Sequence, residues 1–354
     1  MYIRPAPPDP NSCGVTVIIK TLNEEASIAR AIKSALDVTA ELGGEVIVAD
    51  GGSTDRTVAE ARRYPVRVVQ LADPAERCCG IGPQLGYQQS RFDFVYVMDG
   101  DMELKLPFIR IAVDLLLRDK TIAGVGGRVV EQRTNNIEFK SRERHAKSRA
   151  VPNGSPVECL TGGGLYRREA INSAQYLSDR NLHGFEEFDL GARLRINGWR
   201  LVRIDCPAVD HYSHSVGTYT LLWARLRAGR LLAHGEILRS AAASGYVTEA
   251  LTGLHSLRFA LAMLIYWPIV ALLAFTVPSH AVALSLCAFA VPVLAMSLRS
   301  KSIASGLYSV IVWNLSTLTM LAGIVRPRKD PVEPIAFVEL HQPFEPASLA
   351  QMKR

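Results

Sequence analysis

The first hundred residues alternate between short apolar runs and longer segments with helical spacing of apolar positions. Val15–Lys20, Glu45–Ala49, Val66–Leu71 and Phe94–Met98 have the length and the branched or aromatic content of buried strands. Between the first two runs, apolar residues recur three and four positions apart, which predicts an amphipathic helix. Strands and helices alternating at this spacing are typical of a parallel sheet with helices on both faces.

Polar residues follow three of these four runs directly. Thr21 and Asn23 come after the first, Asp50 after the second, and Asp99 and Asp101 after the fourth. The carboxyl ends of parallel strands meet at one edge of a sheet, which is where open α/β sheets bind ligands. The pattern therefore predicts a nucleotide site at this edge.

Only Gly100 separates Asp99 from Asp101. Two carboxylates this close repel one another, and a cation is the natural compensation. We therefore expect Mg²⁺ or Mn²⁺, with phosphate oxygens completing its ligands. Gly100 leaves room for a bulky anion near the backbone. The alternative is a strand that ends in an Asp-Gly turn without any ligand, which is common in proteins.

The second part of the domain continues the same pattern less regularly. Residues 107–118 predict a helix, and residues 122–130 and 199–204 predict strands. The basic segment 131–152 is expected either to lie over the site or to form a solvated face.

A further helix is predicted to begin at Phe185 or Glu186, with Leu190 and Leu194 pointing into the core. Glu186 and Glu187 then lie at the helix start, where the helix dipole favours negative charge. From the residues alone, ordinary charge placement explains this pair.

Six segments occur in an order and spacing that together resemble glycosyltransferase family 2: KTLNEE, VADGGSTDRT, GIGPQLG, VMDGDMEL, TGGGLYRREAI and GFEEFDLGARLRINGWRL. The resemblance covers residues 15–214. It implies an α/β fold of the GT-A type, a Rossmann-like nucleotide-diphospho-sugar transferase domain. It also implies inverting transfer, a nucleotide-diphospho-sugar donor, a divalent metal at the Asp-x-Asp motif, and a carboxylate base on a helix after the acceptor loop.

The resemblance also implies roles for individual residues. Glu187 stands where the family has its catalytic aspartate, and the longer side chain keeps the same chemistry. Asp101 and His211 correspond to metal ligands, although a surface histidine or His214 in its place stays open. Six residues correspond to the nucleotide-sugar site: Thr21, Asn23, Glu24, Asp50, Asp99 and Gly100. Four lie on the acceptor side: Gly162, Gly163, Gly164 and Glu186.

At two positions the sequence also supports a different role from the one that the resemblance implies. Asp50 can also be read as a helix N-cap or Asx-turn residue of its loop. Gln84 replaces the asparagine that the family has in its glycine-containing loop, which weakens the expectation of a donor contact there.

The chain becomes strongly apolar after residue 256. Thr218–Arg239 mixes leucines with arginines, which fits either a helix in the interface of an anionic membrane or an amphipathic helix packed on the domain. Phe259–Val277, Ala281–Leu298 and Ile303–Val325 have about the length needed to span a bilayer. The flanking arginines and lysines place the catalytic domain in the cytoplasm. A third crossing would put the basic residues 326–329 outside, so two and three crossings both stay open.

The expected division of the chain therefore has five parts. They are a flexible lead-in (1–14), the GT-A domain (15–216), interfacial helices (217–256), two or three transmembrane helices (257–325) and a tail (326–354). The lead-in lacks the apolar core of a secretory signal.

The composition of the chain limits the kinds of molecule that it is expected to bind. The 354-residue chain is 48% hydrophobic and carries a net charge of +6, which suits anionic substrates or an acidic membrane surface. A nucleic-acid partner is not expected, because no recognition motif accompanies the charge. The six cysteines show no paired spacing, which favours reduced thiols in a cytosolic domain.

The sequence thus predicts a membrane-associated enzyme that adds a single sugar to a lipid-linked or polysaccharide acceptor. The Gln-x-x-Arg-Trp motif of the family's processive synthases is missing from the sequence, which argues against polymerisation. Two alternatives stay open, namely transfer directly to polyprenyl phosphate and a sugar nucleotidyltransferase that releases pyrophosphate.

Overall fold

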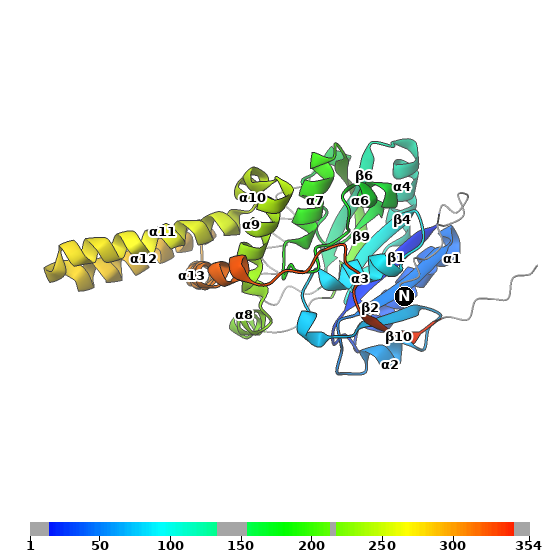
Figure 1. The fold of residues 1–354 in the computed structure, drawn as a ribbon, viewed down its shortest axis with the longest axis horizontal. Coiled ribbons are helices and arrows are strands. Elements are labelled where there is room, and N and C mark those ends of the chain that lie inside the picture. The colour runs from blue at the N-terminus through cyan, green and yellow to red at the C-terminus, as the bar shows by residue number, and fades with distance from the viewer. Residues whose placement is uncertain (1–13, 133–153, 213–216, 343–354) are drawn as a thin grey trace, which may run out of the picture. The chain divides into compact units, whose positions relative to one another are not determined.

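The computed structural model describes residues 14–132, 154–212 and 217–342 (Figure 1). The expected placement of residues 133–152 over the site falls outside this part of the chain, as does His214.

The chain divides into two compact units. The first contains residues 1–182, 186–215 and 329–354, and the second contains residues 183–185 and 216–328. The unit with the sheet thus includes parts of the chain on both sides of the second unit.

The first unit is built on a ten-stranded mixed sheet. Its order is β10-β3-β2-β1-β4-β8-β6-β9-β5, with β7 paired to β9. The strands β3, β2, β1 and β4 are parallel, as the sequence predicts, whereas β8 runs antiparallel to both β4 and β6. The strands are β1 (Val15–Thr21), β2 (Gly44–Asp50), β3 (Arg67–Leu71), β4 (Phe94–Asp99), β5 (Met102–Leu104), β6 (Ile122–Glu131), β7 (Ser155–Pro156), β8 (Gly164–Arg167), β9 (Arg200–His211) and β10 (Phe337–His341).

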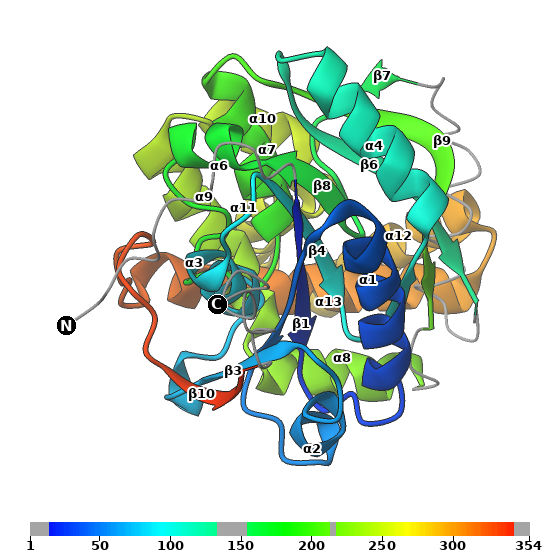
Figure 2. The same ribbon diagram turned by 90° about the vertical axis from the view of Figure 1, so that its right-hand side faces the viewer.

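Helices cover both faces of this sheet (Figure 2). Buried side chains of α1 and α4 pack on one face, and those of α3, α6 and α7 pack on the other, so each face has its own apolar core. The helices are α1 (Ile28–Leu42), α2 (Thr57–Ala61), η1 (Pro74–Glu76), α3 (Ile81–Gln89), α4 (Leu106–Arg118), α6 (Arg168–Ser173) and α7 (Glu186–Ile196). Leu190 and Leu194 of α7 are buried, which confirms the predicted inward face of that helix.

Strand β9 is longer than the sequence pattern suggested. It continues beyond the expected end at Ile204 to His211, through a stretch that contains Pro207. The pairing with β6 shifts register around Pro207, and such irregularities accommodate a proline that cannot donate a ladder hydrogen bond. This extension carries His211 to the sheet edge opposite Met102.

The expected C-terminal tail instead contributes an edge strand to the sheet. Phe337–His341 forms β10, which pairs antiparallel with β3. Arg67 Nε lies 2.6 Å from the Glu339 carboxylate across this pair, and Ile335, just before the strand, is 3% exposed. Residues 335–341 are therefore part of the first unit.

Replacing Ile335 with alanine tests this contribution. The substitution removes a buried side chain from the core that contains Leu71 and Leu85, and we expect a loss of about 3 kcal/mol in the free energy of unfolding of the first unit. Val338→Ala is the matched control, since Val338 is 48% exposed and its truncation is expected to cost less than about 1 kcal/mol. Urea titration with pulse proteolysis of the full chain measures both. Equal costs would contradict a packed β10 segment.

The second unit is helical. Its elements are α8 (Thr218–Arg227), η2 (Arg230–Leu232), α9 (Ala233–Ser244), α10 (Val247–Gly253), α11 (His255–Thr276), η3 (Pro278–His280), α12 (Ala281–Ser300) and α13 (Ile303–Val325). The expected single helix over residues 218–239 is broken at Gly229, whose φ of +71° is a left-handed conformation that glycine adopts without strain. Leu222 of α8 and Leu231 of η2 then share a small buried cluster with α13.

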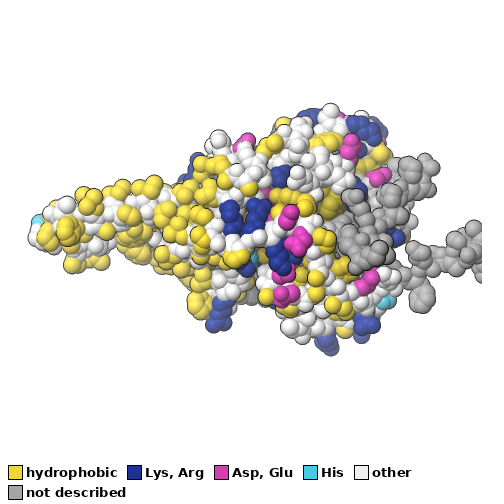
Figure 3. All heavy atoms as spheres, viewed as in Figure 1, with side chains coloured by type: hydrophobic (Ala, Val, Ile, Leu, Met, Phe, Trp, Pro, Cys, Tyr) yellow, Lys and Arg dark blue, Asp and Glu magenta, His cyan; other side chains and the backbone are white. Residues whose placement is uncertain are grey.

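Three helices of this unit are long and apolar enough to cross a membrane: α11, α12 and α13. Large apolar side chains on α11 and α12 are strongly exposed, among them Phe275 at 84% and Val282 at 76%. Hydrophobic atoms accordingly cover this pair of helices in the space-filling view (Figure 3).

Candidate active site

The register of the parallel strands brings the predicted polar residues to one edge. Thr21 lies directly opposite Asp50 between β1 and β2, and Lys20 lies opposite Asp99 between β1 and β4. This confirms the prediction that the carboxyl ends of these strands meet at one edge of the sheet.

Lys20 links two of the candidate acids. Its Nζ lies 3.1 Å from Asp99 Oδ1 and 3.3 Å from Glu186 Oε1. Burial acts to lower the pKa of Lys20, but Asp99, Glu186 and Glu187 raise it well above its ordinary value. Lys20 is therefore an ammonium ion, and it bridges the end of β4 to the first residue of α7.

Glu187 has a different environment from its neighbour. The backbone N–H of Gly162 donates to Glu187 Oε1 at 3.1 Å. Burial raises the pKa of Glu187 to about 7, the Glu186 carboxylate adds to this, and the Lys20 ammonium acts in the opposite direction. A carboxylate whose pKa lies near neutrality is suited to accept a proton under ordinary conditions.

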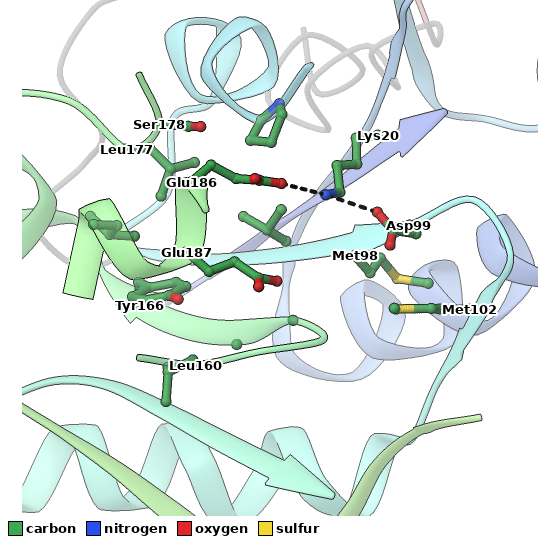
Figure 4. A pocket seen from close by; sticks show the side chains of 15 residues that line it. Lys20, Met98, Asp99, Met102, Leu160, Tyr166, Leu177, Ser178, Glu186 and Glu187 are labelled. Carbon is green, nitrogen blue, oxygen red and sulfur yellow. Dashed lines mark hydrogen bonds and ion pairs between the residues drawn. The ribbon is translucent and has the colours of Figure 1, made fainter. Parts of the chain in front are cut away.

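These side chains line one pocket (Figure 4). Glu186 and Asp99 flank Lys20, while Glu187 points into the same space from α7. Polar groups therefore come from both sides of the pocket, with apolar walls between them. The walls are formed by Pro83, Val97, Met98, Met102, Leu160, Leu177 and Leu190.

Helix α7 is fixed by a buried ion pair. Arg193 and Asp189 lie four residues apart, with nitrogen and oxygen 2.8 Å apart and both side chains almost fully buried. Arg193 also donates to the carbonyl oxygens of Ala174, Tyr176 and Leu177. These bonds tie the helix that carries the two glutamates to the loop that supplies Leu177 to the pocket.

Asp101 and His211 come together as predicted. His211 Nε2 lies 3.3 Å from Asp101 Oδ2, and His211 Nδ1 lies 2.8 Å from Glu131 Oε2. Burial acts to lower the pKa of His211, but hydrogen bonds to the two carboxylates raise it to about 10. The imidazolium thus occupies a position between two acids, where positive charge is favoured.

The donor atoms here fit a hard divalent cation. Asp101 Oδ1 is buried and, among the described residues, has no hydrogen-bond partner. A buried carboxylate oxygen without a partner is costly unless a ligand satisfies it. Within the described part of the chain, no group of three or more His, Cys, Asp and Glu side chains forms a complete metal site. The buried Oδ1 of Asp101 is therefore the described atom at this edge that is best placed to receive a cation, and any such cation would need further donor atoms from elsewhere.

The structure shows why a glycine stands at position 100, and the reason differs from the expected space for an anion. A Cβ atom at this position would lie 2.8 Å from Thr21 Oγ1, so glycine is required by the close approach of β1. Thr21 Oγ1 is itself buried and lacks a hydrogen-bond partner among the described residues. Two polar atoms at this edge, Thr21 Oγ1 and Asp101 Oδ1, are thus left unsatisfied by the protein groups described.

The loop after β2 is organised by Asp50. Its carboxylate accepts hydrogen bonds from the backbone N–H groups of Gly52 and Ser53 and from Gln70 Nε2. Asp50 therefore forms the Asx-turn that the sequence analysis gave as the alternative to a contact between Asp50 and the nucleotide.

Asn23 and Glu24 hold the same region from the β1 side. Asn23 adopts a φ of +57°, and its Oδ1 accepts from the N–H of Thr54. The Glu24 N–H donates to Thr57 Oγ1, and the Glu24 carboxylate accepts from Ser27 Oγ at 2.8 Å. These bonds fix the shape of the loop beside the β1 end.

The three glycines of the acceptor-side motif line or border the pocket. Gly163 and Gly164 are lining residues, and Gly162 reaches Glu187 through its N–H. Gly163 has a φ of +99°, and a Cβ there would lie 2.8 Å from the carbonyl oxygen of Val97. Glycine is therefore needed to bring this backbone against β4.

Gln84 has a structural role. Its Oε1 accepts from the N–H groups of Leu177 and Ser178, both at 3.1 Å. The residue that departs from the family's pattern therefore supports the segment that lines the pocket.

Two site residues were missed at the sequence level. Lys20 lies next to the end of β1 and Glu131 is the last residue of β6, so both share the signal of Asp50 and Asp99, a polar residue at the end of a strand.

Comparison with known proteins gives a family match for the first part of the chain. The model of "Glycosyl transferase family 2" matches residues 16–173. Residues 16–173 are thus similar to the glycosyl transferase family 2 domain. The matched region contains β1, β2, β4 and the acceptor-side glycines, and it ends before α7.

A solved structure shares the fold of this chain. A mannosyltransferase from Pyrobaculum calidifontis, solved with GDP-Man and Mn²⁺, aligns with a TM-score of 0.55 over 90% of each chain at 20% identity. Glucosyl-3-phosphoglycerate synthase from Mycobacterium tuberculosis aligns with a TM-score of 0.47 over 64% of this chain and 78% of its own, at 21% identity. The predicted GT-A fold, followed by three long apolar helices, is confirmed.

Among curated proteins, chondroitin synthase from Pasteurella multocida (strain Pm70) is 25% identical over 119 residues. The match covers 32% of this chain and 12% of the synthase.

Proposed function

We propose that this protein is an inverting glycosyltransferase that moves one sugar from a nucleotide-diphospho-sugar to an acceptor hydroxyl. The observation that carries the proposal is the pocket that Glu187 enters from α7, and in which Lys20 bridges Asp99 and Glu186. This arrangement offers a base on one side of a sugar-binding space and charged groups for a diphosphate on the other.

Glu187 acts as the general base. Inversion requires a group that takes the acceptor proton while the acceptor oxygen attacks the anomeric carbon opposite the leaving diphosphate. The Gly162 N–H holds Glu187 Oε1, which leaves Oε2 for the acceptor hydroxyl. Glu186 is occupied by Lys20 and serves to orient it.

Lys20 and the Asp-x-Asp residues form the donor side. The Lys20 ammonium is placed where it can approach the diphosphate, and Asp99 orients it and meets the donor ribose. Asp101 and His211 would hold Mg²⁺ or Mn²⁺, which supplies charge neutralisation at the diphosphate when bound. His211 would have to lose its Nε2 proton to bind the ion, because a metal ligand must be deprotonated. The unsatisfied Oδ1 of Asp101 and the donor set of one carboxylate and one imidazole support this assignment.

The acceptor is proposed to lie at a membrane. The apolar helices α11, α12 and α13 support attachment to a bilayer, with the catalytic unit on the cytoplasmic face. A lipid-linked saccharide or a growing polysaccharide fits this location. Transfer of a single sugar is favoured because the chain lacks the Gln-x-x-Arg-Trp motif of processive synthases.

A panel of labelled nucleotide sugars tests the proposal. Membranes containing the full chain are incubated with each donor, with and without Mn²⁺, and the lipid-extractable label is quantified. We expect one donor to give metal-stimulated transfer to a saccharide acceptor. A polyprenyl-phospho-monosaccharide product would show that the acceptor is polyprenyl phosphate and not a saccharide. Release of pyrophosphate would show that the protein is a nucleotidyltransferase and not a glycosyltransferase.

The pH dependence of kcat/KM reports the state of the base. Glu187 has a pKa of about 7 and must be deprotonated to act, so activity should fall about tenfold per pH unit below pH 7 and level off above it. The charged groups that face it are Glu186, Lys20 and Asp99. Initial rates between pH 5 and pH 9 measure the profile.

Lys20→Met provides a comparison for that profile. Removing the ammonium removes the charge that lowers the pKa of Glu187, so the acidic limb should move to higher pH. An unchanged limb in this variant would show that a group other than Glu187 controls it.

A further inference from the structure

Helices α11 and α12 form a hairpin. They are joined at η3 by Pro278, Ser279 and His280, and Tyr266 Oη donates to the carbonyl oxygen of Ala288 between them. The two helices run side by side (Figure 1). Each is 20 residues or longer, which is sufficient to cross the hydrocarbon core.

Helix α13 does not continue this arrangement. The chain turns sharply after α12 at Lys301, which has a φ of +53°, and Ser302 caps the start of α13 by accepting from the Ser305 N–H. Figures 1 and 2 show α13 running across the base of the hairpin and not along it.

The contacts of α13 agree with this crossing. Trp313 stacks on Phe259 with ring centroids 4.0 Å apart, and Thr317 Oγ1 donates to the carbonyl oxygen of Ala260 at 2.8 Å. Both partners belong to the first two turns of α11. The end of α13 lies on α9, where Arg239 donates to the carbonyl oxygen of Ile324 at 3.0 Å.

The outward face of α13 is apolar. Leu318, Leu321 and Val325 follow helical spacing and are 75%, 53% and 79% exposed. The neighbouring α8 exposes Tyr219 and Trp223, residues that favour the membrane–water interface. Tyr219 contacts Tyr308 of α13 edge to face, so the two helices present one continuous surface.

The pairing of β10 with β3 determines whether the chain crosses the membrane an even or an odd number of times. The chain leaves the first unit before α8, passes through α11, α12 and α13, and returns to pair β10 with β3 in that same unit. An open sheet of this kind cannot lie within a bilayer. The chain must therefore cross an even number of times between residues 216 and 329.

We infer that α11 and α12 cross the membrane, and that α13 lies in the interface on the catalytic side with its apolar face against lipid. The basic residues then all remain on that side: Arg258, Arg299, Lys301, Arg326, Arg328 and Lys329. The hairpin tip, Pro278–His280, has no lysine or arginine, as the positive-inside tendency requires. This inference goes beyond the proposed function and does not depend on the sugar-transfer chemistry.

Labelling with a membrane-impermeant maleimide tests the topology. Ser279→Cys at the tip and Glu333→Cys before β10 are made separately in the full chain, and labelled peptides are located by mass spectrometry. Sealed membrane vesicles of both orientations are compared, with the native thiol of Cys206, which is partly exposed in the first unit, reporting the catalytic side.

The expected result is that Ser279→Cys reacts only from the face opposite Cys206, and Glu333→Cys only from the same face. Reaction of Glu333→Cys from the opposite face would overturn the even parity. Reaction of Ser279→Cys from the same face as Cys206 would show that the hairpin does not cross. Sugar transfer by the same variants reports the proposed function separately, because the labelling pattern does not require activity.

Nitroxide depth measurements test the position of α13. Single cysteines replace Ile303, Leu318 and Val325 in a background in which the native cysteines are serine, and collision with oxygen and with a water-soluble nickel complex gives the depth of each label. Labels at all three positions should lie at one shallow depth. A spanning helix would separate the first and last by roughly 30 Å, at 1.5 Å per residue, and that result would overturn the interfacial assignment.

Discussion

Glu187→Gln is expected to lower the rate of sugar transfer by about 10³-fold while leaving the affinity for the nucleotide sugar nearly unchanged. The amide keeps the size of the side chain and its bond with the Gly162 N–H, but it cannot accept the acceptor proton. Initial rates measure the first effect, and titration calorimetry with the donor measures the second.

Glu186→Gln is the matched control, because the two glutamates are adjacent on α7 and both line the pocket. This change weakens the bond with Lys20, which is a positioning contact, and should cost much less transfer than the loss of the base. The acidic limb of kcat/KM should persist in Glu186→Gln. Normal turnover by Glu187→Gln would remove that residue from the mechanism.

Asp101→Ala should lower metal-stimulated turnover by about 100-fold or more and weaken the apparent affinity for Mn²⁺. The variant removes the buried carboxylate whose Oδ1 has no partner among the described protein groups, and a cation at the diphosphate supplies several kcal/mol of charge stabilisation. Turnover as a function of Mn²⁺ concentration, with a chelator-treated sample as the zero point, measures both effects.

Glu103→Ala separates this effect from a general loss of negative charge. Glu103 lies two residues further along the chain, and its carboxylate pairs with Lys105 at 3.1 Å. Its removal should leave the Mn²⁺ dependence unchanged. If both variants lose metal stimulation equally, Asp101 is not a specific ligand.

The parallel part of the fold and its edge were predictable because their signals are local. Asp50, Asp99 and Asp101 each follow an apolar run, and parallel strands place such residues together whatever the rest of the chain does. The extended β9 was harder, since Pro207 interrupts the pattern and only pairing with β6 shows that the strand continues.

The sequence could not distinguish the roles of Glu186 and Glu187 by itself. Both residues have the same chemistry and adjacent positions, and the difference lies in their partners, Lys20 for one and the Gly162 N–H for the other. These partners are distant in the chain, so the distinction depends on the fold. The resemblance to a family supplied what local pattern could not.

The position of β10 was missed for a related reason. Five residues with a mixed polar pattern carry little strand signal, and the partner of Glu339 across the pair, Arg67, lies 272 positions earlier. Neither a window of sequence nor a composition shift identifies such a pairing. The family model, which ends at residue 173, does not reach it either.

This late strand also constrains how the protein is made. During translation β3 emerges early, and its outer row of N–H and C=O groups has no neighbour until the ribosome has released residues 337–341. The apolar helices α11, α12 and α13 are synthesised during that interval. A nascent chain stopped by a premature codon before residue 337 would keep a bare sheet margin, which makes it a template for aggregation and a substrate for quality-control proteases.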